Sequence, residues 1–109
     1  MWKIKTENIV RISKALSDKN RVEIIKLLSD EELCACHLLE YFDFTQPALS
    51  HHMKQLVESE LVLVEKRAQW SYYKINKIVF DEFKEFIENV SLSEYDEEFD
   101  NSKCCKIKK

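Results

Sequence analysis

The chain has 109 residues and a mass of 13.1 kDa, which suffices for one domain with a modest core and is too short for a second. Hydrophobic residues make up 45% of it and charged residues 34%, so the composition is globular and excludes a wholly disordered chain. The absence of glycine and the single proline exclude collagen-like, glycine-rich and many-turned β-sandwich folds. We therefore expect helices joined by tight connections.

The net charge of −3 by itself argues against contact with nucleic acid, but the charge is unevenly distributed. Residues 94–100 contain five acidic residues and no basic one, whereas residues 44–77 contain five basic and three acidic residues. Because the local distribution decides phosphate contact, the middle of the chain is still compatible with DNA binding.

No segment of the sequence predicts a membrane span or a secretory signal. The longest aliphatic run covers residues 61–64, far below the roughly 20 residues that a spanning helix needs. The first residues lack the apolar stretch and small-residue cleavage site of a signal peptide. We expect a cytoplasmic protein without a membrane partner. In that reducing compartment, closely spaced cysteines are more often metal-binding or redox-active than part of a disulfide framework.

The first half of the chain shows helical spacing of its apolar residues. We predict two core helices at 6–16 and 19–29, with Asp18 as the N-cap of the second. A third, short helix is predicted at 33–42 and carries Cys34 and Cys36.

A fourth helix is predicted at 46–58, because Thr45 can cap it and Pro47 falls in its first turn. The third and fourth helices, joined by a short turn, form a helix-turn-helix unit. The spacing of the fourth helix buries Leu49, Met53 and Leu56 and turns Gln46, Ser50, His51, Lys54 and Gln55 outward.

Two runs rich in β-branched and aromatic residues follow, at 61–66 and 70–75, and predict a hairpin with a basic tip. The last helix is predicted at 77–90. The order α-α-α-α-β-β-α is that of a winged helix-turn-helix, mainly α with a β-hairpin wing. We assign residues 1–93 to this domain and 94–109 to a flexible tail, acidic at first and then containing Cys104, Cys105 and lysines.

The last helix carries an apolar stripe that is large for so small a monomer. Its members are Val79, Phe80, Phe83, Ile87 and Val90. Together with the first helix, this stripe predicts a two-fold interface between two copies of the chain.

Enzymatic interpretations have little support in the sequence. It lacks a glycine-rich phosphate loop, an H-E-x-x-H motif and the C-x-x-C of thioredoxin type. Thiol-disulfide exchange at Cys34/Cys36 or at Cys104/Cys105 is the enzymatic alternative. We predict that the protein is not an enzyme.

Cys34 and Cys36 are the best candidates for chemistry. Thiolates select soft metals and semimetals, and a helix N-terminus favours the thiolate form. On a regular helix, residues two apart point about 200° away from each other. If both sulfurs bind one ion, the first turn must therefore unwind or tilt. A third donor could come from Cys104, Cys105, His37 or a small-molecule thiol.

Two segments carry a family resemblance. They are E-L-C-A-C-H-L-L-E at residues 32–40 and T-Q-P-A-L-S-H-H-M-K-Q-L at residues 45–56. Both closely resemble the ArsR/SmtB family, and most nearly its arsenical-resistance repressors of the Gram-positive type. The resemblance extends over about residues 6–90.

The resemblance implies a homodimeric winged-helix repressor that holds operator DNA when empty and releases it on binding As(III) or Sb(III). It places the inducer on Cys34 and Cys36. Some members have a third cysteine in the same helix, but that position is Leu39 here. The Gram-positive relatives also lack it and carry cysteines near the C-terminus, as Cys104 and Cys105 are here.

Other inducers are less consistent with the sequence. Zinc-sensing relatives use histidine on the last helix, and residues 77–90 contain none. Cadmium and lead sensors add an N-terminal cysteine, and none precedes Cys34. A Cd/Pb-responsive repressor and a thiol-redox repressor on the same fold are the alternatives.

The resemblance also places the fourth helix in the major groove of DNA. The residues that would then reach bases or phosphates are Gln46, Ser50, His51 and Lys54. Lys66 and Arg67 at the hairpin tip would meet the adjacent backbone or minor groove. The family's wing often contains glycine, and this one has none.

Overall fold

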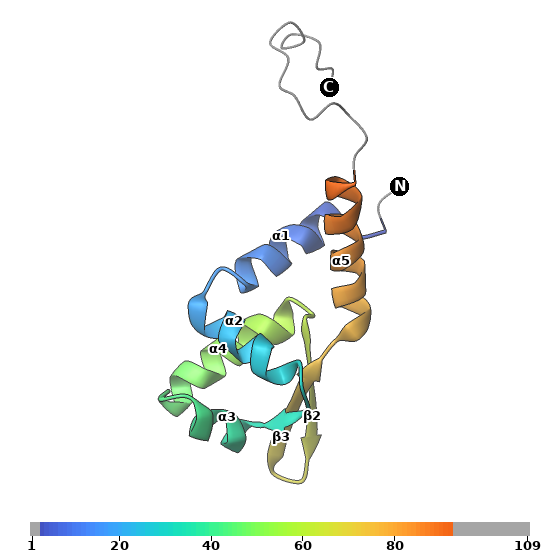
Figure 1. The fold of residues 1–109 in the computed structure, drawn as a ribbon. Coiled ribbons are helices and arrows are strands. Elements are labelled where there is room, and N and C mark those ends of the chain that lie inside the picture. The colour runs from blue at the N-terminus through green and yellow to red at the C-terminus, as the bar shows by residue number, and fades with distance from the viewer. Residues whose placement is uncertain (1–2, 93–109) are drawn as a thin grey trace, which may run out of the picture.

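The computed structural model describes residues 3–92 (Figure 1). Within this stretch the helices are α1 (Thr6–Ala15), α2 (Lys19–Leu28), α3 (Ala35–Tyr41), α4 (Gln46–Glu58) and α5 (Lys77–Ser91). The strands are β1 (Leu33–Cys34), β2 (Val62–Arg67) and β3 (Trp70–Ile75). The winged helix-turn-helix prediction is confirmed, with one short strand, β1, added to the expected order. The tail predicted at 94–109 lies outside the described residues.

Three of the helices begin at side chains that cap them. The carboxylate of Asp18 accepts hydrogen bonds from two backbone N–H groups in the first turn of α2. The hydroxyl of Thr45 accepts one in α4, where Pro47 occupies a position that needs no N–H donor. Asn76 caps α5 in the same way. These local signals explain why the predicted starts of α2, α4 and α5 are correct.

The wing is part of a three-stranded antiparallel sheet with the order β1-β3-β2. The hairpin pairs β2 with β3, from Val62 opposite Ile75 to Arg67 opposite Trp70. On the other edge of β3, β1 places Cys34 opposite Tyr72. The helix-turn-helix unit is therefore hydrogen-bonded to the wing through the segment that carries the first cysteine.

Two residues adopt the left-handed backbone conformation that glycine usually provides. Glu60, with φ of 69°, follows the end of α4, and Ala68, with φ of 58°, forms the turn between β2 and β3. The chain has no glycine, so ordinary residues take up these conformations at an energetic cost. The wing tip is thus a tight turn built without glycine.

The core lies between the helices and the base of the sheet. Its fully buried side chains are Ile12, Ile24, Leu38, Met53, Leu56, Leu61 and Val62. As predicted, α4 buries Leu49, Met53 and Leu56, while Gln46, Ser50, His51 and Lys54 are exposed. Gln55, which was also expected to face outward, is half-buried. This packing fixes α4 by one face and leaves the other to solvent.

Helix α5 runs away from the wing toward the end of the molecule where the chain begins (Figure 1). None of its residues is buried. Several of its apolar side chains, those of Ile78, Ile87 and Val90, are at least half exposed, as is that of Leu92 directly after it. Val10 on α1 is also exposed. Of the stripe predicted for α5, Val79, Phe80 and Phe83 pack against this chain's own core and Ile87 and Val90 are exposed, so the dimer interface stays a prediction. Among residues 3–92, no helix is both long and apolar enough to cross a membrane.

Candidate functional site

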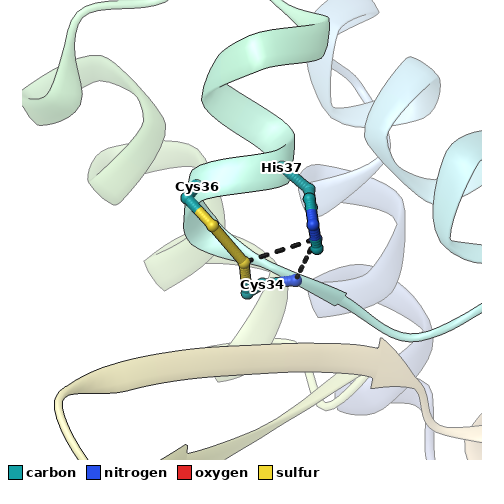
Figure 2. The surroundings of a disulfide bond; sticks show 3 residues. All are labelled: Cys34, Cys36 and His37. Carbon is teal, nitrogen blue, oxygen red and sulfur yellow. Dashed lines mark hydrogen bonds between the residues drawn. A yellow bond between two sulfur atoms is a disulfide. The ribbon is translucent and has the colours of Figure 1, made fainter.

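The candidate ligand site lies at the junction of β1 and α3. Figure 2 shows Cys34 and Cys36 joined through their sulfur atoms, with the ring of His37 beside them. The Sγ atom of Cys34 lies 3.3 Å from Nδ1 of His37. That nitrogen also accepts a hydrogen bond from the backbone N–H of Cys34, at 3.4 Å. The three side chains therefore converge at the first turn of α3.

The expectation that both cysteines lie within one regular helix was wrong. Helix α3 begins at Ala35, and Cys34 is its N-cap with an extended backbone, φ −89° and ψ 164°. The cause is tertiary, because Cys34 pairs with Tyr72 across the sheet. The two sulfurs therefore face each other while α3 stays regular. The sequence-based inference that a shared ligand must unwind the first turn of the helix assumed that both cysteines lie on that helix, and it therefore no longer holds.

The arrangement has the donor set of a soft-ion site. One ligand atom from each of Cys34, Cys36 and His37 lies within 4.8 Å of the others. The structure holds the sulfur pair in its disulfide form, and two-electron reduction gives two thiols that bind as thiolates. Cys34 is buried, Cys36 is half-buried and His37 is exposed. The site is thus anchored on one side and open to solvent on the other.

A hollow of about 370 Å³ adjoins the exposed side of this site. It is lined by Glu31, Glu32, Leu33, His37, Glu40 and Tyr41. Three carboxylates next to the imidazole give this entrance a negative potential. Cations are attracted to such an entrance more strongly than neutral molecules.

The candidate DNA-reading surface is the exposed face of α4, which is held from behind by partly buried contacts. His52 points inward, where its ring lies 5.4 Å from that of Phe44. Arg21 on α2 donates to Nδ1 of His52 at 3.2 Å and to the carbonyl of Ala15 at 2.6 Å. Sequence patterns did not reveal Arg21, because its contact with His52 joins residues 31 positions apart in the chain.

Both predicted wing residues, Lys66 and Arg67, are exposed, but the structure already gives Arg67 partners. Its Nη2 atom donates to Glu32 at 2.6 Å and to Glu65 at 3.0 Å. The guanidinium also lies 4.4 Å from the centre of the Tyr72 ring. The two hydrogen bonds raise the pKa of Arg67. The basic wing tip is therefore partly neutralised by its own carboxylates.

The structure brings only part of the predicted site residues together. Cys34 and Cys36 form one group, joined by His37. The predicted DNA-contacting residues lie on two separate elements, Gln46, Ser50, His51 and Lys54 on α4 and Lys66 and Arg67 on β2, and their role stays a prediction. Cys104 and Cys105 lie outside the described residues, so their role as donors stays a prediction.

Comparisons with known proteins place this architecture among bacterial regulators. Residues 18–64 match the family described as bacterial regulatory protein, arsR family. The chain is 49% identical over 81 residues to the arsenical resistance operon repressor of Staphylococcus aureus, covering 74% of this chain and 75% of the relative. It is 47% identical over 83 residues to the repressor of the same name from Staphylococcus xylosus, covering 76% and 80%.

Solved structures give the same fold. An ArsR-like transcriptional regulator from a Rhodococcus species has a TM-score of 0.70 and 21% identity, covering 78% of this chain and 80% of that one. HlyU from Vibrio cholerae has a TM-score of 0.64 and 25% identity, covering 84% and 99%.

The fold, the family match and the relatives together define a winged helix-turn-helix transcription regulator, which is not an enzyme. The chain belongs to the arsR family of bacterial regulatory proteins, whose members bind DNA. The resemblance found in the sequence is thereby confirmed.

Proposed function

We propose that the protein is a cytoplasmic, homodimeric repressor that holds its operator DNA when the cysteine pair is empty and releases it on binding As(III) or Sb(III). The observation that carries this proposal is the convergence of the Cys34 and Cys36 sulfurs at the start of α3, the helix that precedes α4. The names of the staphylococcal relatives support a metalloid as the inducer.

The chemistry uses the reduced pair. Cys34 and Cys36 each displace one hydroxyl from As(OH)₃, so two As–S bonds form and two water molecules leave. A third sulfur, from Cys104, Cys105 or an external thiol, displaces the last hydroxyl and releases a third water. His37 lies beside the pair and is the other candidate donor.

Repression requires that α4 and the wing contact DNA together. Gln46, Ser50, His51 and Lys54 face solvent on one side of α4, as a helix in the major groove requires. Lys66 and Arg67 extend the contact to the adjacent backbone or minor groove. In a dimer, two such surfaces would read two half-sites.

A DNA-release titration tests the proposal. The protein, bound to a labelled fragment of its own promoter, is titrated with arsenite under reducing conditions at fixed salt, and anisotropy is recorded. The wild type should lose DNA affinity by an amount typical of allosteric coupling, about 1–3 kcal/mol. The Cys34→Ser/Cys36→Ser variant should bind DNA equally well and ignore arsenite; release by this variant would contradict the assignment.

The tail cysteines need a separate variant. Cys104→Ser/Cys105→Ser leaves the α3 pair intact and serves as the matched control. Weaker arsenite binding by this variant identifies the tail as the third donor. Unchanged binding assigns that position to an external thiol or to His37.

Two observations favour other inducers strongly enough to include them in the same titration. The disulfide between Cys34 and Cys36 favours a thiol-redox repressor, which would release DNA with diamide or peroxide alone. The acidic hollow beside His37 favours a divalent soft cation, so Cd²⁺ and Pb²⁺ are titrated as well. Release by either at concentrations where arsenite has no effect would replace the metalloid as inducer.

A further inference from the structure

An ion pair connects the cysteine segment with the tip of the wing. The Oε2 atom of Glu32 lies 2.6 Å from Nη2 of Arg67, although the two residues are 35 positions apart in the chain. Glu32 lies two residues before Cys34, and Arg67 is the last residue of β2. The contact therefore joins the candidate ligand site to a residue expected to meet DNA.

The sheet provides a second connection between the same parts. Cys34 is paired with Tyr72 in the register of β1 and β3. The guanidinium of Arg67 lies over the ring of Tyr72, 4.4 Å from its centre. A displacement of β1 thus reaches Arg67 both through the carboxylate of Glu32 and through the ring of Tyr72.

The carboxylates bound to Arg67 compete with DNA phosphate for the N–H groups of its guanidinium. Nη2 carries two N–H donors, and it bonds to two carboxylates, those of Glu32 and Glu65. An arginine fork that binds carboxylate is the same fork that binds a DNA phosphate. Two carboxylates around one guanidinium also offset its positive charge, which weakens its attraction for the DNA backbone. In this arrangement both N–H groups of Nη2 are engaged by carboxylates and are withheld from DNA phosphate.

The structure contains both features at once, with the sulfurs of Cys34 and Cys36 together and Arg67 bound by Glu32. We propose that Glu32 is the positioning residue through which the cysteine pair controls the wing. When the pair is bridged, β1 holds the Glu32 carboxylate on Arg67; when the pair is open, Arg67 is free to bind phosphate. This inference rests on the proposed function, because bridging must lower DNA affinity.

The test compares Glu32→Gln with Glu65→Gln. Each variant removes one carboxylate charge from the same guanidinium, but only Glu32 adjoins β1, whereas Glu65 lies on β2 with Arg67. The measured quantity is the ratio of the DNA Kd with arsenite to the DNA Kd without it. Glu32→Gln should lower this ratio by about two- to fivefold, the size of an exposed ion pair. Glu65→Gln should shift both Kd values by one common factor and leave the ratio unchanged.

Two further variants separate the contact from its charge. Glu32→Asp keeps the charge but shortens the reach, so it should lower the ratio as Glu32→Gln does. In an Arg67→Gln background, Glu32→Gln should have no further effect on the ratio. Equal shifts of both Kd values by Glu32→Gln, or an effect that persists without Arg67, would overturn the role of Glu32. Far-UV circular dichroism checks that all variants are folded.

A diamide arm distinguishes failure of this inference from failure of the proposed inducer. Diamide takes two electrons and two protons from the thiol pair and closes it without any metalloid. If arsenite does not release the wild type but diamide does, the proposed inducer is wrong, and the role of Glu32 is judged from the oxidised-to-reduced Kd ratio. If neither treatment lowers DNA affinity, both proposals are overturned.

Discussion

Arg21 on α2 donates from Nη1 to Nδ1 of His52 on α4, across 3.2 Å. Arginine has only donors, so Nδ1 must be the accepting nitrogen of a neutral imidazole. The same arginine is anchored on the carbonyl of Ala15 at the end of α1. A neutral His52 is therefore part of what holds α4 against the helices behind it.

This contact predicts that stability falls in mild acid. Burial lowers the pKa of His52 below its ordinary value of 6.5, and the charge of Arg21 lowers it further, although Asp18 opposes the shift. The unfolded chain then takes up the proton first, so stability declines as pH drops below 6.5 toward the folded-state pKa. Urea unfolding at about pH 7.5 and about pH 5.5 measures this decline.

A variant assigns that decline to His52. His52→Gln keeps an acceptor for Arg21 but cannot titrate, so its unfolding free energy should change less between the two pH values. His51→Gln, at the exposed neighbouring position, is the matched control; His51 is the smallest contributor to the lowered pKa of His52, so this variant should stay closer to the wild type than His52→Gln does. Parallel pH dependences for all three proteins would show that the decline has another source.

Lys54 is exposed on the outer face of α4 and is expected to contact phosphate. Replacement by glutamine should weaken binding to all DNA sequences alike and should reduce the slope of log affinity against log salt by about one. Lys84→Gln, on exposed α5, removes the same charge away from the reading helix and should leave the slope unchanged. Equal slopes for wild type and Lys54→Gln would remove Lys54 from the interface.

The turn at Ala68 predicts a stabilising substitution. Left-handed backbone costs a non-glycine residue about 1–2 kcal/mol, whereas glycine costs about 0.5–1 kcal/mol in backbone entropy. Ala68→Gly should therefore stabilise the protein by about 0.5–1 kcal/mol in chemical unfolding. Gln69→Gly gains no such relief, since φ at Gln69 is not positive, and should be destabilising. A loss of stability in Ala68→Gly would contradict the turn geometry.

The exposed apolar residues of α5 predict a monomeric variant. Ile87 is 50% exposed, so a glutamate there costs the monomer little but places a charge in the proposed dimer interface. We expect Ile87→Glu to sediment as a monomer and to bind DNA more weakly. Asn89→Glu adds the same charge at an exposed polar position nearby and should stay dimeric. A dimeric Ile87→Glu protein would place the interface elsewhere.

Local signals in the sequence were enough for most of the fold. Thr45 and Pro47 define the start of α4, and the β-branched and aromatic run after Leu61 defines the wing. The error at Cys34 has a different origin. Its extended backbone comes from pairing with Tyr72, 38 positions later. The local spacing of apolar residues cannot predict such a distant strand partner.

The candidate site was likewise predictable from the sequence only in part. The spacing of Cys34 and Cys36 and the outward face of α4 are visible in the sequence. The contacts of Arg21 with His52 and of Glu32 with Arg67 are not, because each joins side chains more than 30 positions apart. For His37 the sequence left open whether it is a donor or faces solvent. The structure finds it exposed and still 3.3 Å from the Cys34 sulfur.

The division of the two cysteines between a strand and a helix restricts which guests the site can accept. Cys34 belongs to β1 and Cys36 to α3, so a guest that bonds both sulfurs links the sheet to the helix. A single atom with two short bonds to sulfur fits between β1 and α3, whereas a longer bifunctional reagent would push these two elements apart. Selectivity by size is thus set by backbone architecture before the identity of any further donor matters.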